Sequence, residues 1–291
     1  MLDGVRNYIV SRIASRHVAG KDLKDALVVC EWATSRGFNF VLSPWKNGEV
    51  SVLNETDKEH NTESFLNAIH TVQRIQGNGY LSIKLDALDY DPDLFIKILD
   101  TAKSAGVRVH VDSLGPDTAD INFKFLEQAS SYREHLGCTL PSRWKRSLTD
   151  AEKAMDMGLA VRLVKGQWED PIHKVDHRQN YLNIARKLAG NVPYIGVATH
   201  DKNLAKQTLQ ILKSYHNVFE LEQFFSLPLN GIELAKQMGC SFRIYTSYGY
   251  PAIPYNYRFA MTRPELGVWM ASDFAFHFKK PWENKLNKIS H

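Results

Sequence analysis

The chain has 291 residues, 44% of them hydrophobic, which is enough for one large buried core. Its 36 Lys and Arg residues nearly balance 32 Asp and Glu residues, so we expect no basic face for nucleic acid, and three distant cysteines argue against a disulfide framework and suit a reducing compartment. No segment approaches the ~20 apolar residues of a membrane span, and we therefore expect a cytoplasmic protein.

Residues 1–30 come first along the chain, and their amphipathic pattern predicts a helical extension that packs on the main domain. Beyond them, short β-rich runs alternate with segments whose apolar residues recur at helical spacing, which is typical of repeated βα units. The predicted strands are Phe38–Leu42, Tyr80–Leu85, Val107–Asp112, Leu136–Leu140, Ala160–Val164, Tyr194–Thr199, Val218–Leu221 and Phe242–Thr246.

Seven amphipathic segments between and after these strands predict helices, and several end in Gly or follow Ser, Thr or Asp, as helix termini do. They are residues 62–75, 92–105, 118–131, 148–158, 177–190, 203–215 and 231–239. Eight βα units favour a closed (β/α)8 barrel of the TIM type, with residues 1–291 as one domain. An open doubly wound sheet stays an alternative, although no G-x-G-x-x-G turn follows the first strand.

Charged and polar side chains stand near the ends of most predicted strands. Because such barrels carry their chemistry at the C-terminal ends of the strands, and because a lone buried charge is costly, we predict that these residues form a site. They are Lys84, Asp86, His110, Asp112, Arg162, Lys165, His200, Glu220, Glu222 and Tyr245.

Two chemistries compete for this set of residues. His110 and Asp112, two residues apart on one face of a strand, would form a zinc-like set with His200 and support a metal-dependent hydrolase. Lys84 and Arg162 oppose this reading, because their positive charges would repel a cation. The second chemistry is the binding of an electron-rich ligand.

The stretch VRLVKGQWED supports the second chemistry. It contains Arg162, Lys165 and Gly166, a combination suited to binding an electron-rich ring and its phosphates. Near the C-terminus, Arg258 at the start of a predicted helix follows several tyrosines, which is typical of a pocket that fixes an anion beside an apolar ring.

Four motifs, taken in their order along the chain, resemble the flavin-binding proline dehydrogenases: SIKLDAL, VRLVKGQW, VATHD, and RIYTSYG followed by PYNYRF and RPE. The resemblance spans Phe38 to Leu266. It implies a distorted (β/α)8 barrel that binds FAD without a covalent link and oxidises L-proline to pyrroline-5-carboxylate, with a hydride passing to flavin N5. It also implies an electron acceptor such as a membrane quinone, which would place the protein peripherally at a membrane.

The resemblance assigns five residues to the flavin. Arg162 matches the arginine that faces flavin N5, and Lys165 and Gly166 continue the same motif. Thr199 and His200 match the segment that reaches the FAD pyrophosphate and adenosine.

The substrate residues implied by the resemblance come from several strands. Lys84 matches the lysine that contacts the substrate carboxylate, and Asp112 matches the active-site aspartate. Together with Arg162 they are the predicted catalytic residues. The expected walls of the substrate ring and the expected carboxylate clamp are Trp168, Tyr245, Tyr255 and Arg258.

The chain departs from the resemblance where substrate should lie. Phe259 replaces the second arginine of the clamp, Thr262 replaces a glutamate, and Pro141 falls near an expected glutamine beside the flavin. An Arg-to-Phe exchange removes a charge-assisted bond worth roughly 1.5 to 3 kcal/mol, or about ten- to a hundredfold in affinity. The substrate is therefore predicted to be proline, or a cyclic amine whose carboxylate is modified or absent. A catalytically impaired flavin-binding barrel stays a further alternative.

Overall fold

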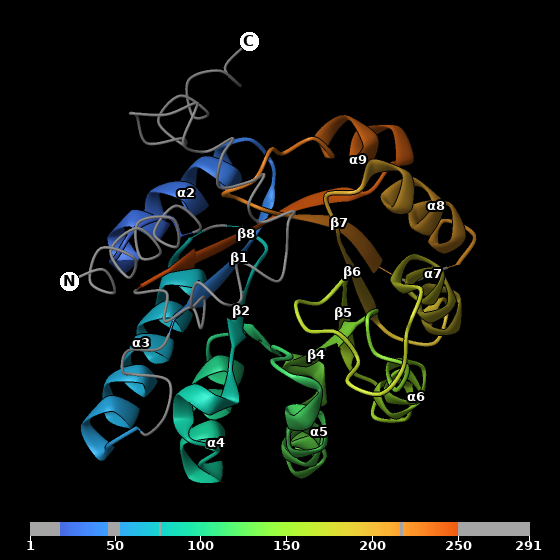
Figure 1. The fold of residues 1–291 in the computed structure, drawn as a ribbon. Helices are drawn as coiled ribbons and strands as arrows, with labels where there is room; N and C mark the ends of the chain where they lie inside the picture. Colours follow the sequence, from blue (N-terminus) through green and yellow to red (C-terminus); the bar gives the residue numbers. More distant parts are fainter. Residues whose placement is uncertain (1–17, 46–52, 76, 216–217, 250–291) are drawn as a thin grey trace, which may run out of the picture.

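Eight strands close into a barrel in the computed structural model of the chain, which describes residues 18–45, 53–75, 77–215 and 218–249 (Figure 1). All neighbouring strands are parallel, and β8 pairs with β1, so the predicted (β/α)8 barrel is confirmed and the open sheet is wrong. The strands are β1 (Asn39–Pro44), β2 (Gly79–Ile83), β3 (Arg108–Val111), β4 (Leu136–Pro141), β5 (Ala160–Val164), β6 (Tyr194–Ala198), β7 (Val218–Phe224) and β8 (Ser241–Tyr248).

The predicted strands differ from these by at most three residues at either end. The largest difference is at β7, which continues three residues beyond the predicted end at Leu221. Glu222 and Gln223 are polar, but both are buried and continue the ladder with β8. Their polar groups are satisfied by the Tyr80 hydroxyl for Glu222 and by backbone groups and Asn230 for Gln223.

Helices surround the barrel, and each of the seven predicted segments overlaps one, with the largest difference at the helix that begins at Glu55, seven residues before the predicted start at residue 62. The α-helices are α2 (Leu23–Ser35), α3 (Glu55–Arg74), α4 (Pro92–Ser104), α5 (Ala119–Gln128), α6 (Ser147–Asp156), α7 (His177–Leu188), α8 (Lys202–Leu212) and α9 (Ile232–Met238), and the 3₁₀ helices are η2 (Leu85–Leu88), η3 (Pro116–Thr118) and η4 (Ser130–His135). An aspartate directly precedes and caps each of α4, α7 and α8, accepting two backbone N–H hydrogen bonds of the first turn: Asp91, Asp176 and Asp201. None of the described helices combines the length and the apolar character needed to cross a membrane.

Helix α2 precedes β1 and packs against both β1 and β8 (Figure 1). Its buried face consists of Ala26, Val29, Cys30 and Ala33. Of the predicted extension over residues 1–30, residues 1–17 lie outside the described part of the chain, and the described part becomes helical at Leu23.

The two faces of the barrel strands differ in chemistry. Alternate residues such as Leu81 and Ile83 of β2 pack outward into the large apolar core beneath the helices. The apolar cluster inside the barrel is small and consists of Val41, Tyr80, Ala160, Tyr194 and Tyr245. Much of the remaining interior is charged or hydroxylated, which is unusual for a fold whose interior is commonly packed with Val, Ile and Leu.

Candidate active site

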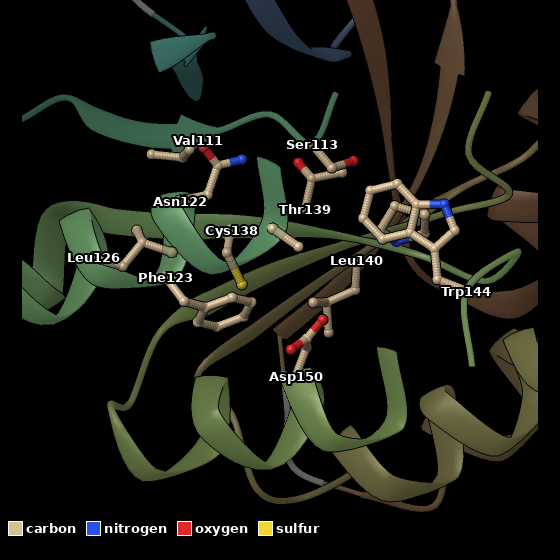
Figure 2. Close-up of a pocket in the computed structure, with 12 residues that line it drawn as sticks. Val111, Ser113, Asn122, Phe123, Leu126, Cys138, Thr139, Leu140, Trp144 and Asp150 are labelled. Atoms are coloured by element: carbon tan, nitrogen blue, oxygen red, sulfur yellow. The ribbon is translucent and has the colours of Figure 1, made fainter. Parts of the chain in front are cut away.

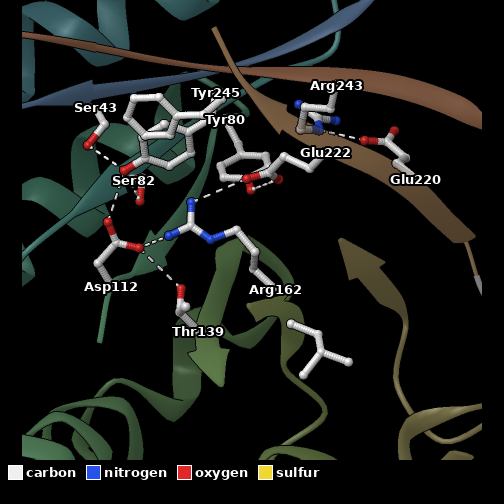
Figure 3. Close-up of polar contacts among 12 residues, drawn as sticks. Ser43, Tyr80, Ser82, Asp112, Thr139, Arg162, Glu220, Glu222, Arg243 and Tyr245 are labelled. Carbon is white, nitrogen blue, oxygen red and sulfur yellow. Dashed lines mark hydrogen bonds and ion pairs between the residues drawn. The ribbon is translucent and has the colours of Figure 1, made fainter. Parts of the chain in front are cut away.

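Asp112, the residue directly after β3, lies at the centre of a buried polar cluster near the C-terminal ends of the strands (Figure 3). It is ion-paired with Arg162 Nη2 of β5, and Lys84 Nζ, just after β2, lies 3.3 Å from its Oδ2 atom. Thr139 Oγ1 donates a hydrogen bond of 3.2 Å to Oδ1. Asp112 is 6% exposed and Arg162 is 4% exposed. The structure therefore brings together the three residues predicted to be catalytic, and the charges of the two most buried ones compensate each other.

Tyr245 of β8 completes the polar surroundings of this carboxylate. Its hydroxyl lies 3.0 Å from Asp112 Oδ2 and 2.8 Å from Ser43 Oγ. Burial raises the pKa of Tyr245, but the positive charges of Lys84 and Arg162, with hydrogen bonds to nearby serines, outweigh burial, and the net pKa is lowered. The phenol is thus a strong hydrogen-bond donor whose ring is held in one position.

Arg162 is held from three sides. Besides Asp112, it has Glu222 Oε1 at 3.5 Å from Nη1 and the ring of Tyr245 at 4.7 Å from Cζ. Glu222 in turn accepts a 2.7 Å hydrogen bond from the Tyr80 hydroxyl, and burial raises the pKa of Glu222 although Arg162 opposes that shift. Nε and Nη1 of Arg162 are buried and have no hydrogen-bond partner among the described residues. The site therefore offers a fixed guanidinium with donors left for an acceptor.

Lys84 belongs to the predicted carboxylate site. Its Nζ atom lies 5.0 Å from the ring centroid of Trp45, and its side chain is 20% exposed, so the ammonium reaches from the buried cluster toward solvent. The other predicted substrate residues near the C-terminus, Tyr255, Arg258 and Phe259, lie outside the described residues.

Lys165 and Gly166 directly follow β5. Gly166 has φ +87°, and a Cβ atom there would lie 2.6 Å from Pro141 Cβ. The backbones that follow β4 and β5 stay paired after the strands end, since the Arg143 N–H donates a 3.2 Å hydrogen bond to the Lys165 carbonyl. A glycine is thus favoured here by the positive φ angle and by the close contact with Pro141. Pro141 is the position near which the resemblance expects a glutamine.

Thr199 and His200 follow β6, and the structure places both in hydrogen bonds within the protein. Thr199 Oγ1 accepts from the Asp201 N–H at 3.1 Å. His200 Nε2 accepts from the Phe224 N–H at 2.9 Å, and its Nδ1 lies 3.2 Å from the Pro228 carbonyl. Both ring nitrogens of His200 are therefore engaged in fixing the β6–α8 and β7–α9 loops.

Trp168, the predicted aromatic wall, lies in the loop after β5. Its carbonyl accepts a 2.9 Å hydrogen bond from the indole Nε1 of Trp144, which anchors this loop to the segment that follows β4. Trp144 is 2% exposed, so the anchor is itself part of the packed structure.

His110 lies in the barrel interior. Its ring stacks on Tyr80 with centroids 4.3 Å apart, and a Cβ atom on Gly137 would lie 2.5 Å from its Nε2. Burial, reinforced by nearby arginines, lowers the pKa of His110 well below its usual value, so the ring is neutral. Among the described residues, no three His, Cys, Asp or Glu side chains are arranged to hold a metal ion. The zinc alternative with Asp112 and His200 is not supported by this geometry.

A small cavity lies beside β4, between the strand and the helices α5 and α6 (Figure 2). Its volume is about 20 Å³, and it is lined by residues such as Cys138, Thr139 and Trp144. That volume is on the scale of a single water molecule and is too small for a substrate.

Comparisons with known proteins agree with this barrel and its motifs. A scan against protein-family models finds no match. Proline dehydrogenase 2 of Bacillus subtilis is 25% identical over 289 residues, which cover 94% of this chain and 92% of the relative. Proline dehydrogenase 1 of the same species is 27% identical over 270 residues, covering 86% of this chain and 87% of the relative.

Solved structures of proline utilization A share the fold. The protein from Bdellovibrio bacteriovorus matches with a TM-score of 0.71 at 15% identity over 83% of this chain, and that from Corynebacterium freiburgense with 0.67 at 13% over 91%. The match spans about a third of each of those longer chains, 31% and 33%. Over most of its length the chain is thus similar in sequence to proline dehydrogenases and shares the barrel fold of proline utilization A, in agreement with the resemblance of its motifs.

Several residues of the site were not singled out from the sequence. Ser43, Tyr80 and Thr139 each contact a charged group or Tyr245, and Glu222 was noted only as a polar strand residue. The alternation of side chains along a strand could have identified Tyr80, because it lies four residues before Lys84 and therefore on the face of β2 that leads to Lys84. Their partners depend on barrel closure, which the spacing does not give.

Proposed function

We propose that this protein catalyses FAD-dependent oxidation of the C–N bond of L-proline or of a close proline derivative. The observation that carries the proposal is the buried Arg162, held between Asp112 and Glu222 with an Nε donor that has no partner among the described residues, in a barrel similar to those of proline dehydrogenases. A fixed guanidinium stabilises negative charge that develops beside it, and burial strengthens this effect.

The chain's residues fit a flavin at the position that the motifs imply. The residues assigned to hold it are Arg162, Lys165, Gly166, Thr199 and His200. Within the described part of the chain, Arg162 Nε is a buried donor without a partner, and Nη1 has only its 3.5 Å ion pair with Glu222, so an acceptor on the flavin would complete the hydrogen bonding of this guanidinium. His200 would act by shaping its loop, since both its ring nitrogens are engaged. FAD, when bound, supplies the acceptor for the hydride that leaves the substrate.

The substrate would lie against the cluster around Asp112. Lys84 would bind the substrate carboxylate, and the rings of Tyr245 and Trp168 would limit how the substrate ring can turn. Arg162, Lys84 and Asp112 are the proposed catalytic residues. The remaining proposed contacts are Tyr255, Arg258 and Phe259. The amine would lose its proton to water before oxidation, so no dedicated base is needed.

The substrate class is the finer part of the proposal. One arginine at Arg258 with Phe259 beside it suits free proline less well than an arginine pair would, and it suits an ester, an amide or a simple cyclic amine better. The electron acceptor is proposed to be a quinone or another carrier outside this chain.

An anaerobic absorbance titration tests the proposal. The purified protein is loaded with FAD and mixed with L-proline, then with proline esters, amides and cyclic amines. Bleaching of the yellow band by one of these compounds is expected, and Arg162→Ala should slow it by at least ~100-fold, because a fixed charge at a reacting group contributes about 2.7–4 kcal/mol. Arg146→Ala removes an arginine that pairs with Asp120 and Asp150 outside the barrel, and it should bleach normally.

Failure to bind FAD would end the flavoenzyme proposal, and binding without bleaching by any compound would favour the impaired barrel. The substrate class is tested with Phe259→Arg, which should raise the apparent affinity for free proline about ten- to a hundredfold and leave the methyl ester nearly unchanged. If Phe259→Arg changed the affinity for free proline and for its methyl ester to the same extent, Phe259 would not lie at the carboxylate site.

A further inference from the structure

A second cavity opens at the other end of the barrel. Its volume is about 510 Å³, within the range of small-molecule sites. Its lining includes the first residues of β3, β5, β6 and β7, so it lies at the N-terminal mouth, away from the cluster around Asp112. Nothing in the proposed reaction uses this end of the barrel.

Arg108, the first residue of β3, lines this cavity. Its Cζ atom lies 3.9 Å from the ring centroid of Tyr194 and 4.9 Å from that of Tyr80, so two aromatic faces hold the guanidinium in place. Arg108 Nε is buried without a hydrogen-bond partner, and Arg108 makes no ion pair with any residue of the described ranges. The aromatic faces stabilise the charge but leave the N–H groups at its edge unused.

The nearest buried carboxylates inside the barrel are committed to other partners. Glu220 pairs with Arg243 and also accepts from Tyr194 at 3.1 Å. Glu222 accepts from Tyr80 and faces Arg162. Inside the barrel at this end, Arg108 and Arg243 thus share one carboxylate, Glu220, which pairs with Arg243 and leaves Arg108 without an ion pair among the described residues.

The rim of the cavity limits the charge of a ligand. Arg133 adds a second cation, while Glu134 and Asp156 add two carboxylates. Glu220 also lines the cavity, but its charge is balanced by Arg243. Glu134 and Asp156 would repel a phosphate more strongly than a carboxylate, because a phosphate carries close to two negative charges near pH 7 and a carboxylate carries one. An amine on the same ligand would be attracted to the rim.

We propose that the N-terminal mouth of the barrel is a second binding site, for a small carboxylate anchored on Arg108. A planar guanidinium matches the two oxygens of a carboxylate, and its stacking on Tyr194 means that little side-chain freedom is lost on binding. An amino acid or another carboxylate with a distant amine fits the rim best.

Calorimetric titration of the full chain tests this site with three probes: butyrate, 4-aminobutyrate and inorganic phosphate. We expect both carboxylates to bind, 4-aminobutyrate more tightly, and phosphate the weakest. Arg108→Gln should lower the affinity for both carboxylates about tenfold or more. Arg108→Lys should lower it less, because a lysine keeps the positive charge but lacks the two parallel N–H donors of the guanidinium.

Two control variants locate the binding. Arg186→Gln removes an arginine of α7 that does not line the cavity, and Lys84→Met removes the cation of the catalytic end; neither should change binding at the mouth. Thermal unfolding midpoints show that each variant is folded. Binding that survives Arg108→Gln, binding lost in Lys84→Met, no binding of either carboxylate, or phosphate binding at least as tight as butyrate would each overturn the proposal.

Discussion

The pairing of Asp112 with Arg162 predicts a large coupling free energy between these two residues. Both are nearly inaccessible to solvent, so neither charge can be hydrated when its partner is removed. Asp112→Asn and Arg162→Met should each lower the free energy of unfolding by up to about 3–5 kcal/mol, since each breaks the buried pair and leaves its partner with a more distant counter-ion only, Glu222 for Arg162 or Lys84 for Asp112. The double variant removes both charges and should lose far less than the sum.

Urea unfolding of the four proteins, followed by circular dichroism at pH 7, measures the coupling. We expect an interaction free energy of about 2–3 kcal/mol or more. Thr139→Val is the matched control, because it removes only one hydrogen bond to the same carboxylate and should cost about 1 kcal/mol. Losses that add within about 0.5 kcal/mol would refute the pairing in solution.

Two further predictions concern His110 and Gly166. Burial lowers the pKa of His110 in the folded state, so as the pH falls the imidazole is protonated in the unfolded chain before it is protonated in the folded protein. The stability that the neutral ring contributes is therefore complete above pH ~6.5 and is lost as the pH falls toward the folded pKa. Relative to His110→Leu, wild-type stability should fall by up to ~1.4 kcal/mol more per pH unit below pH 6.5 in urea titrations, and parallel pH profiles would contradict a neutral buried ring. Gly166→Ala should destabilise by about 1–3 kcal/mol, more than Gly106→Ala, since both have positive φ but only Gly166 would also meet Pro141; equal losses in urea unfolding would rule out that contact.

The architecture was predictable because each strand and helix has its own local pattern. The β-rich runs and the helical spacing between them identified eight units, and the rule that barrel chemistry lies at the C-terminal strand ends brought Lys84, Asp112, Arg162 and Tyr245 into one prediction. All four lie in one cluster in the structure. Local sequence was sufficient here because each residue stands at or near the end of its own strand.

Partners set by barrel closure were not predictable in the same way. Ser43 meets Tyr245 because β1 pairs with β8, and about two hundred residues separate these strands in the sequence. The two hydrogen bonds of His200 depend on the paths of two loops, so a histidine noted as a candidate ligand proves to be tied to the backbone near Phe224. No periodicity encodes either arrangement.

The charges of the described site bear directly on the choice of substrate. Lys84 and Arg162 face Asp112 and Glu222, so two cations already meet two carboxylates before any substrate binds. A substrate carboxylate adds a third negative charge to a buried site and calls for a third cation, because an unpaired buried charge is costly. By resemblance that cation is Arg258, and a family member with an arginine pair has a fourth. Under the proposed assignment, Phe259 would remove only this fourth charge. The site would then be neutral with free proline bound and would carry one positive charge with an ester or a simple amine. On that assignment, the exchange would weaken the preference for free proline over its ester without abolishing it.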